Sequence, residues 1–146
     1  MEQTKIAMPR HFTHLHEHTR EELFSLVDKA ISLKKFPSPA LPLSGKSLAF
    51  CFMNPSLRTQ VSFEVATASL GAHALILSLG TSTWQMEFMD GIVMDGKAAE
   101  HLKEAVAVLS RYCQLLALRS FPAGASWELD KTEPYLSAFR KYSSVP

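Results

Sequence analysis

The stretch SLAFCFMNPSLRTQVSFEVATASLG, residues 47–71, decides the fold. It opens with a short and continuously apolar run, Ser47–Met53, which is typical of a strand buried on both faces of a parallel sheet. Pro55 ends that strand, and apolar residues then recur at helical spacing until Gly71, which suits a helix C-terminal cap. This helical stripe consists of Leu57, Val61, Val65 and Ala68. The stretch therefore predicts a buried strand followed at once by a helix.

The same alternation of helices and strands continues on both sides of this stretch. Residues 13–36 predict a helix, because Thr19 and Glu22 form a capping box and the apolar residues behind them keep helical spacing. Residues 37–45 carry three prolines and predict a connector. Downstream, the sequence predicts strands at 73–79 and 115–121, helices at 98–113 and 133–143, and loops at 80–96 and 121–134.

This order predicts an α/β fold, in which an N-terminal helix is followed by β-α-β-α-β-α. Such an alternation favours a parallel sheet with helices on both faces. A fourth strand is expected to begin at about Ser143–Pro146, where the sequence ends. We therefore expect a domain that lacks its last strand, or a fragment of a longer protein.

Composition favours one globular domain over residues 1–146, with 47% apolar residues and a net charge of +1 from 15 basic and 14 acidic side chains. The sequence has no basic block that would attract nucleic acid, and no apolar run near the roughly 20 residues that cross a membrane. The N-terminus lacks the apolar segment of a secretory signal. Cys51 and Cys113 are predicted to be buried free thiols, which suit the reducing cytoplasm.

The junction between the first strand and its helix predicts an anion-binding site. Ligands of open parallel sheets bind outside the carboxyl ends of the strands, and the segment Asn54–Thr59 lies at that edge. Ser56 suits the helix N-cap, so the free N–H groups of the first turn and the positive end of the helix dipole face outward. The hydroxyls of Ser56 and Thr59 add donors, and Arg58 adds a charged fork that matches phosphate or carboxylate.

Arg119 falls at the equivalent end of the third predicted strand, where it can converge with Arg58 on one anion. Each feature alone also has a plainer interpretation. Ser and Thr at a helix start often serve only as a cap, and an arginine after a strand is often only solvated. Neither a Walker A sequence nor a dinucleotide fingerprint occurs. The residues alone thus predict an anion-binding α/β domain and leave its reaction open.

Two other segments invite a metal interpretation. Residues 11–19, HFTHLHEHT, hold four histidines but match no structural zinc spacing. Asp90 and Asp95 each precede a glycine, which predicts turns rather than a calcium loop. We expect neither a metal nor a cofactor.

The segment FMNPSLRTQVSFE, residues 52–64, resembles the carbamoyl-phosphate motif Ser-x-Arg-Thr of the aspartate/ornithine carbamoyltransferase family. Further stretches resemble the branch of that family that acts on N-acetylornithine and N-succinylornithine. They are LGAHALIL, TSTWQMEF, GIVMDG, EHLKEAVAVLSRYCQLLALRSFP and FRKYSSVP. The resemblance covers nearly the whole chain, but only about the N-terminal half of a family member, which is the carbamoyl-phosphate-binding domain.

The resemblance implies a carbamoyltransferase that moves the carbamoyl group of carbamoyl phosphate to the side-chain amine of an N-acylated ornithine, in arginine biosynthesis. Arg58 and Arg119 would be the catalytic charges, and Arg119 would reach both the phosphate and the carbamoyl oxygen. Trp84 matches a loop tryptophan that enters the neighbouring subunit's site in this branch, which implies a homotrimer. Packing of Trp84 under its own loop is an equally good interpretation. The residues implied to bind the phosphate group are Ser56, Leu57 (through its backbone), Arg58 and Thr59.

Three positions qualify what the resemblance implies about the substrate. Two residues before the His of EHL, glutamate accompanies acetyl and proline accompanies succinyl in this branch, whereas this sequence has Ala99. Glu87 would line the site or orient the loop tryptophan. Gln60 replaces the last arginine of the family's common Ser-x-Arg-Thr-Arg. Acetyl is slightly favoured, and the alternatives are ornithine or aspartate carbamoylation, or a non-catalytic anion-binding or oligomerisation fragment.

The family's His-Pro-x-Gln segment, which contacts the carbamoyl group, would follow Pro146. The 146-residue chain by itself is therefore expected to bind carbamoyl phosphate weakly and not to turn over.

Overall fold

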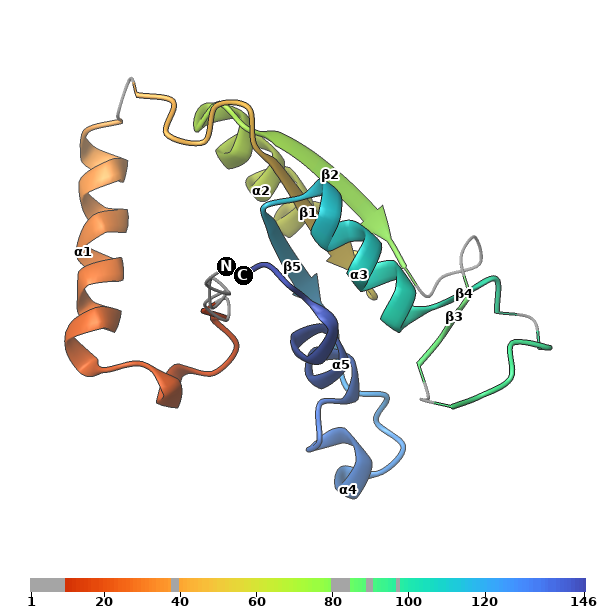
Figure 1. Ribbon diagram of the computed structural model, residues 1–146. Helices are drawn as coiled ribbons and strands as arrows, with labels where there is room; N and C mark the ends of the chain where they lie inside the picture. The colour runs from red at the N-terminus through yellow and green to blue at the C-terminus, as the bar shows by residue number, and fades with distance from the viewer. Residues whose placement is uncertain (1–9, 38–39, 80–84, 89–90, 97) are drawn as a thin grey trace, which may run out of the picture.

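A computed structural model of the protein describes residues 10–37, 40–79, 85–88, 91–96 and 98–146. Its main sheet consists of three parallel strands in the order β2-β1-β5, which confirms the predicted α/β architecture (Figure 1). The strands are β1 (Ser47–Phe52), β2 (His73–Ser78) and β5 (Leu115–Arg119). The register places Phe52 opposite both Ser78 and Arg119, so the three carboxyl ends meet at one edge.

Helices cover both faces of this sheet, as predicted. They are α1 (Arg20–Lys35), α2 (Leu57–Ser69), α3 (Leu102–Tyr112), α4 (Trp127–Asp130) and α5 (Pro134–Tyr142), with a short 3-10 turn at Leu15–Glu17. Side chains of β1 alternate between the faces, and the central strand is buried from Leu48 to Phe52. On one face the ring of Phe50 lies 4.7 Å from that of Phe63 in α2. On the other, Cys51 packs with residues of α3 and α5.

The two cysteines are both buried free thiols, as predicted. Burial, with a smaller contribution from nearby Cys113, raises the pKa of the Cys51 thiol to about 12. Burial also raises the pKa of the Cys113 thiol. Both side chains are therefore protonated near neutral pH and act as small apolar groups in the core.

The glycine that ends α2 is needed for the close approach of the connector. Gly71 has φ +83°, a left-handed conformation, and follows the last turn as the sequence predicts. A Cβ added at Gly71 would lie 2.7 Å from the Cβ of Leu41. Glycine here both ends the helix and lets the connector pass against it.

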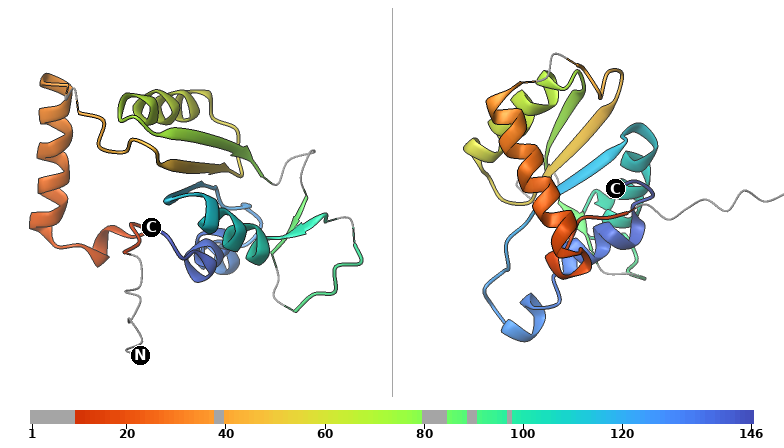
Figure 2. Two further views of the ribbon diagram at one scale, coloured as in Figure 1. Left: turned by 45° about the horizontal axis from the view of Figure 1, so that its top comes forward. Right: turned by 90° about the vertical axis from the view of Figure 1, so that its left-hand side faces the viewer.

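The predicted capping box of α1 is present, because Thr19 accepts from the N–H of Glu22 and Glu22 accepts from the N–H of Thr19. The helix stands away from the sheet, and none of its residues is buried (Figures 1 and 2). Segment 10–18, which precedes α1, contacts α5 through the hydrogen bonds that Arg140 donates to Thr13 and Glu17. The hydrogen bond from Arg140 holds the pKa of Glu17 below its ordinary value.

The apolar stripe of α2 also faces away from the sheet. Leu57 is 78% exposed and Val65 59% exposed, whereas Phe63 and Thr67 make the inward side of the helix. The helical spacing predicted from the sequence is thus correct, but it marks an outer surface rather than the contact with the sheet.

A second, small sheet joins the predicted loop at 80–96 to the first residues of the helix predicted at 98–113. Strand β3 (Met86–Glu87) pairs in parallel with β4 (Glu100–His101). This pairing delays the start of α3 to Leu102, four residues after the predicted start, and His101 becomes its N-cap. The Nδ1 atom of His101 accepts the N–H of Lys103 at 3.0 Å, so its proton in the neutral ring is on Nε2. The predicted loop at 121–134 likewise contains α4.

The outer edge of β5 is contacted by the end of the chain. The N–H of Leu116 donates to the carbonyl of Pro146 at 2.9 Å. The sequence predicts that a fourth strand begins at about these last residues, Ser143–Pro146.

Candidate anion-binding site

The turn from β1 into α2 presents its donors outward. Ser56 occupies the N-cap position, as predicted, but its hydroxyl does not cap the helix and instead donates to the Oγ1 of Thr59 at 2.9 Å. The first helical bond runs from the N–H of Gln60 to the carbonyl of Ser56. The N–H groups of residues 57–59 precede that bond and have no partner within the helix. They lie at the positive end of the helix dipole, where an anion is stabilised.

Arg119 reaches this turn from β5, which confirms that the two strand ends converge. Its Nη1 atom donates to the Oγ1 of Thr59 at 3.3 Å. Its Nε atom is buried and has no hydrogen-bond partner among the described residues. A buried N–H of a charged group without a partner is costly, and an anion beside Thr59 would supply the missing acceptor. Ser56, Thr59 and Arg119 therefore form a connected donor cluster at the carboxyl edge.

The other predicted phosphate-binding residues are placed differently. Arg58 and Leu57 lie in the same first turn, and both are exposed. Arg58 thus belongs to the outer side of the site, whereas the guanidinium of Arg119 is partly buried. Gln60, half-buried in that turn, contributes no positive charge.

The residues implied in substrate choice lie in and beside the small sheet. Glu87 pairs with His101 in β3–β4, and Ala99 is exposed just before β4, with its N–H donating to the carbonyl of Gln85 at 3.1 Å. Trp84 lies outside the described residues, so its predicted role stays a prediction.

Two residues near the cluster make contacts for which the sequence carries no signal. Asn54 accepts the N–H of Phe121 at 2.8 Å, although the two are 67 positions apart. The Phe121 ring lies under the guanidinium of Arg119, with 4.7 Å from Cζ to the ring centroid. Only the meeting of β1 and β5 at one edge brings these residues together.

The histidine-rich segment makes contacts with other side chains. His14 lies 3.2 Å from a carboxylate oxygen of Glu133, and the ring of His18 lies 4.5 Å from that of Phe12. Among the described residues, no group of three or more His, Cys, Asp or Glu could hold a metal ion. Within the same residues, no helix is long and apolar enough to cross a membrane.

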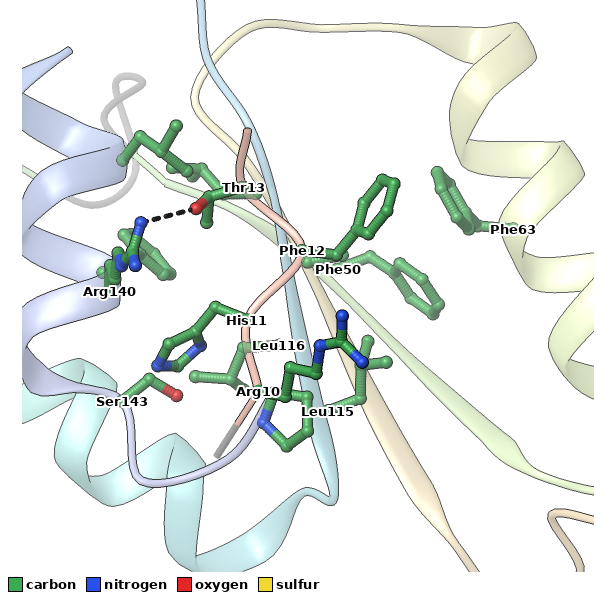
Figure 3. Close-up of a pocket in the computed structure, with 15 residues that line it drawn as sticks. Arg10, His11, Phe12, Thr13, Phe50, Phe63, Leu115, Leu116, Arg140 and Ser143 are labelled. Atoms are coloured by element: carbon green, nitrogen blue, oxygen red, sulfur yellow. Dashed lines mark hydrogen bonds between the residues drawn. The ribbon is translucent and has the colours of Figure 1, made fainter. Parts of the chain in front are cut away.

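A hollow of about 390 Å³ lies along the outer side of β5, between that strand, α5 and segment 10–13, and not at the carboxyl edge (Figure 3). Its walls are mostly apolar, from Phe50, Phe63 and strand β5. Arg140, a charged residue of its lining, is engaged with Thr13. The two arginines that line the hollow, Arg10 and Arg140, are paired with the carboxylates of Glu22 and Glu17. Arg119 at the carboxyl edge has an unpartnered Nε among the described residues, so the edge is the better candidate for an anion.

Comparisons with known proteins show the family to which the chain is similar. The family described as aspartate/ornithine carbamoyltransferase, carbamoyl-P binding domain, matches residues 10–146. The N-acetylornithine carbamoyltransferase of Xanthomonas campestris pv. campestris is 41% identical over 94% of this chain and 40% of its own length. The N-succinylornithine carbamoyltransferase of Bacteroides thetaiotaomicron is 37% identical over 69% of this chain and 32% of its own length.

Solved structures of N-acetylornithine transcarbamylases are also similar to this chain. A crystal structure of acetylornithine transcarbamylase complexed with acetylcitrulline superimposes with a TM-score of 0.87 and 41% identity, over 94% of this chain and 41% of that one. A mutant N-acetyl-L-ornithine transcarbamylase complexed with carbamyl phosphate and N-succinyl-L-norvaline has the same TM-score, 0.87. The chain thus spans about 40% of the length of the N-acetylornithine carbamoyltransferases that it matches.

Proposed function

The chain belongs to the aspartate/ornithine carbamoyltransferase family, and we propose that its donor cluster binds carbamoyl phosphate for transfer to an N-acylated ornithine. The observation that carries the proposal is the link from Arg119 through Thr59 to Ser56, together with the unpartnered Nε of Arg119. This cluster lies where parallel α/β sheets bind their ligands, beside a helix N-terminus that favours anions.

Each group in the cluster has a distinct task in the proposed complex. The N–H groups of the first turn of α2 and the hydroxyls of Ser56 and Thr59 hold the phosphate oxygens. Arg58 approaches from the solvent side, while Arg119 donates to a phosphate oxygen and to the carbamoyl oxygen. Both arginines oppose negative charge that grows on these oxygens in the transition state.

The proposed reaction is a direct transfer. The side-chain amine nitrogen of the acylated ornithine forms a bond to the carbamoyl carbon, and the bond from that carbon to the bridging phosphate oxygen breaks. Phosphate leaves with the electron pair, and the amine nitrogen loses a proton. The described residues contribute position and fixed charge, so binding the phosphate in one orientation is their main effect on the rate.

An acylated ornithine is supported as the acceptor by relatives that are named for N-acetylornithine and N-succinylornithine. A relative named for ornithine, from Pelobacter propionicus, is 43% identical over 78% of this chain and 34% of its own length, so that acceptor is the second candidate. Acetyl is slightly favoured, and Ala99 and Glu87 beside the small sheet are the positions that we assign to acyl choice. We further propose a cytoplasmic homotrimer in which Trp84 enters a neighbouring site.

The proposal is tested by calorimetric titration of the 146-residue chain with carbamoyl phosphate. We expect saturable binding at one site per chain, competed by inorganic phosphate. Arg58→Ala should weaken binding about tenfold, because an exposed arginine contributes one charge-assisted contact.

Arg111→Ala is the matched control, because Arg111 is an exposed arginine in the last turn of α3. Its affinity should equal that of the unmodified chain. Absence of binding by the unmodified chain would contradict the proposed ligand. Equal losses in the Arg58 and Arg111 variants would place the anion elsewhere.

A further inference from the structure

We propose that Asn54 and Phe121 are positioning residues that hold Arg119 in its anion-binding orientation, an inference that rests on the proposed function. Neither side chain needs to touch the ligand. Asn54 holds the backbone at Phe121, the ring of Phe121 supports the guanidinium, and the guanidinium points its donors at the turn of α2.

The first link joins the two chain segments that leave the sheet at this edge. Asn54 follows β1 and Phe121 follows β5, and the side-chain oxygen of Asn54 accepts the N–H of Phe121 at 2.8 Å. The N–H of Met53 also donates to the carbonyl of Arg119, at 2.9 Å. The bond with Met53 is made by Arg119 itself and the bond with Asn54 by Phe121, so the backbone is tied to the end of β1 at Arg119 and again two residues later.

The second link acts on the side chain. The Cζ atom of Arg119 lies 4.7 Å from the centroid of the Phe121 ring. A ring under the face of a guanidinium attracts the charge and leaves the N–H groups in the guanidinium plane able to donate. The ring is 53% exposed, so its packing in the core does not explain why an aromatic residue stands here.

The third link fixes the direction of the guanidinium. Nη1 is bonded to the hydroxyl of Thr59 at 3.3 Å, while Nε is buried and has no partner among the described residues. The guanidinium of Arg119 is already held by the hydrogen bond at Nη1 and by the ring of Phe121. It therefore loses little conformational entropy when an anion binds to its remaining donors. The Asn54–Phe121 pair therefore raises affinity by pre-organising Arg119, rather than by adding a contact.

Carbamoyl-phosphate titrations of variants of the 146-residue chain test this inference. Phe121→Leu should weaken binding about tenfold. Phe121→Tyr keeps the ring and should stay within about twofold of the unmodified chain. Asn54→Ala should also weaken binding, but by much less when Phe121→Leu is already present, because both changes act through the same ring.

The matched control is Tyr112→Leu, which removes a 71%-exposed aromatic side chain at the end of α3. It should leave affinity unchanged and should shift the melting temperature as little as Phe121→Leu does. Affinity in Phe121→Leu equal to that of the control, or no recovery in Phe121→Tyr, would overturn the inference.

A readout that needs no ligand separates this inference from the proposed function. The NMR signal of the Arg119 Nε–H group is assigned by its loss in Arg119→Lys. Its chemical shift should differ from that of a solvent-exposed arginine because of the ring current of Phe121. In Phe121→Leu the chemical shift should return to the value of a solvent-exposed arginine. A displaced signal without carbamoyl-phosphate binding would refute the proposed ligand and leave the positioning role intact. A signal unchanged by Phe121→Leu would refute the positioning role.

Discussion

Replacement of Arg119 by alanine is expected to weaken the binding of carbamoyl phosphate about 100-fold. Truncating one partner of a partly buried, hydrogen-bonded charge pair commonly costs about 2–5 kcal/mol of binding free energy. Arg119 meets these conditions, because it is half-buried, bonded to Thr59 and left with one buried donor unpaired. Calorimetric titration of the 146-residue chain measures the loss.

Arg119→Lys provides the matched comparison. Lysine keeps the positive charge but has neither the planar fork nor the face that stacks on Phe121. It should therefore bind more weakly than the unmodified chain and more tightly than Arg119→Ala. The far-ultraviolet circular dichroism of both variants should match that of the unmodified chain, because the guanidinium lies at the edge of the sheet and not in its core. An alanine variant that binds as the unmodified chain does would remove Arg119 from the site.

Replacement of Leu102 by alanine is expected to lower the free energy of unfolding by about 2–5 kcal/mol, the range for a large-to-small change in a packed core. Leu102 is fully buried at the first position of α3, where it packs in one cluster with Cys51 and Phe139. That cluster also contains Met86 of β3, so the cavity would loosen the small sheet as well as the main one.

Urea unfolding followed by circular dichroism measures this loss. Val108→Ala is the matched control, because Val108 lies on the same helix and is 50% exposed. Its effect should stay within about 1 kcal/mol, because it removes little buried area. Equal losses in the two variants would show that the burial of Leu102 in the core does not govern the stability of α3.

The central part of the fold could be predicted because local pattern and tertiary role agree there. Ser47–Phe52 is apolar on both faces because helices cover both faces of β1, and Pro55 marks the end of that strand. Parallel strands with helical connections must then bring the ends of β1 and β5 to one edge. For this reason the sequence predicts that Arg119 lies at the same edge as the turn Asn54–Thr59, and its hydrogen bond to Thr59 agrees with that position.

Other features could not be predicted because they depend on long-range contacts. Strands β3 and β4 have two residues each, too few to show an alternating pattern. Histidine is not a common N-cap, so the start of α3 after His101 had no signal. The hydrogen bond from Phe121 to Asn54 joins two loops that are adjacent only after the sheet has formed. The outward orientation of the α2 stripe likewise depends on which side of the helix meets the sheet.

The most direct test of the central claim is an NMR titration of the ¹⁵N-labelled 146-residue chain with carbamoyl phosphate, with backbone amides assigned. We predict that the largest chemical-shift changes fall on the amides of residues 57–59 and on the side-chain N–H groups of Arg119, at the carboxyl edge of the sheet. Amides that line the apolar hollow, such as those of Leu116 and Phe139, should change little. Changes centred on the hollow, or no saturable change at any position, would contradict the assignment of carbamoyl phosphate to the edge formed by β1, α2 and β5.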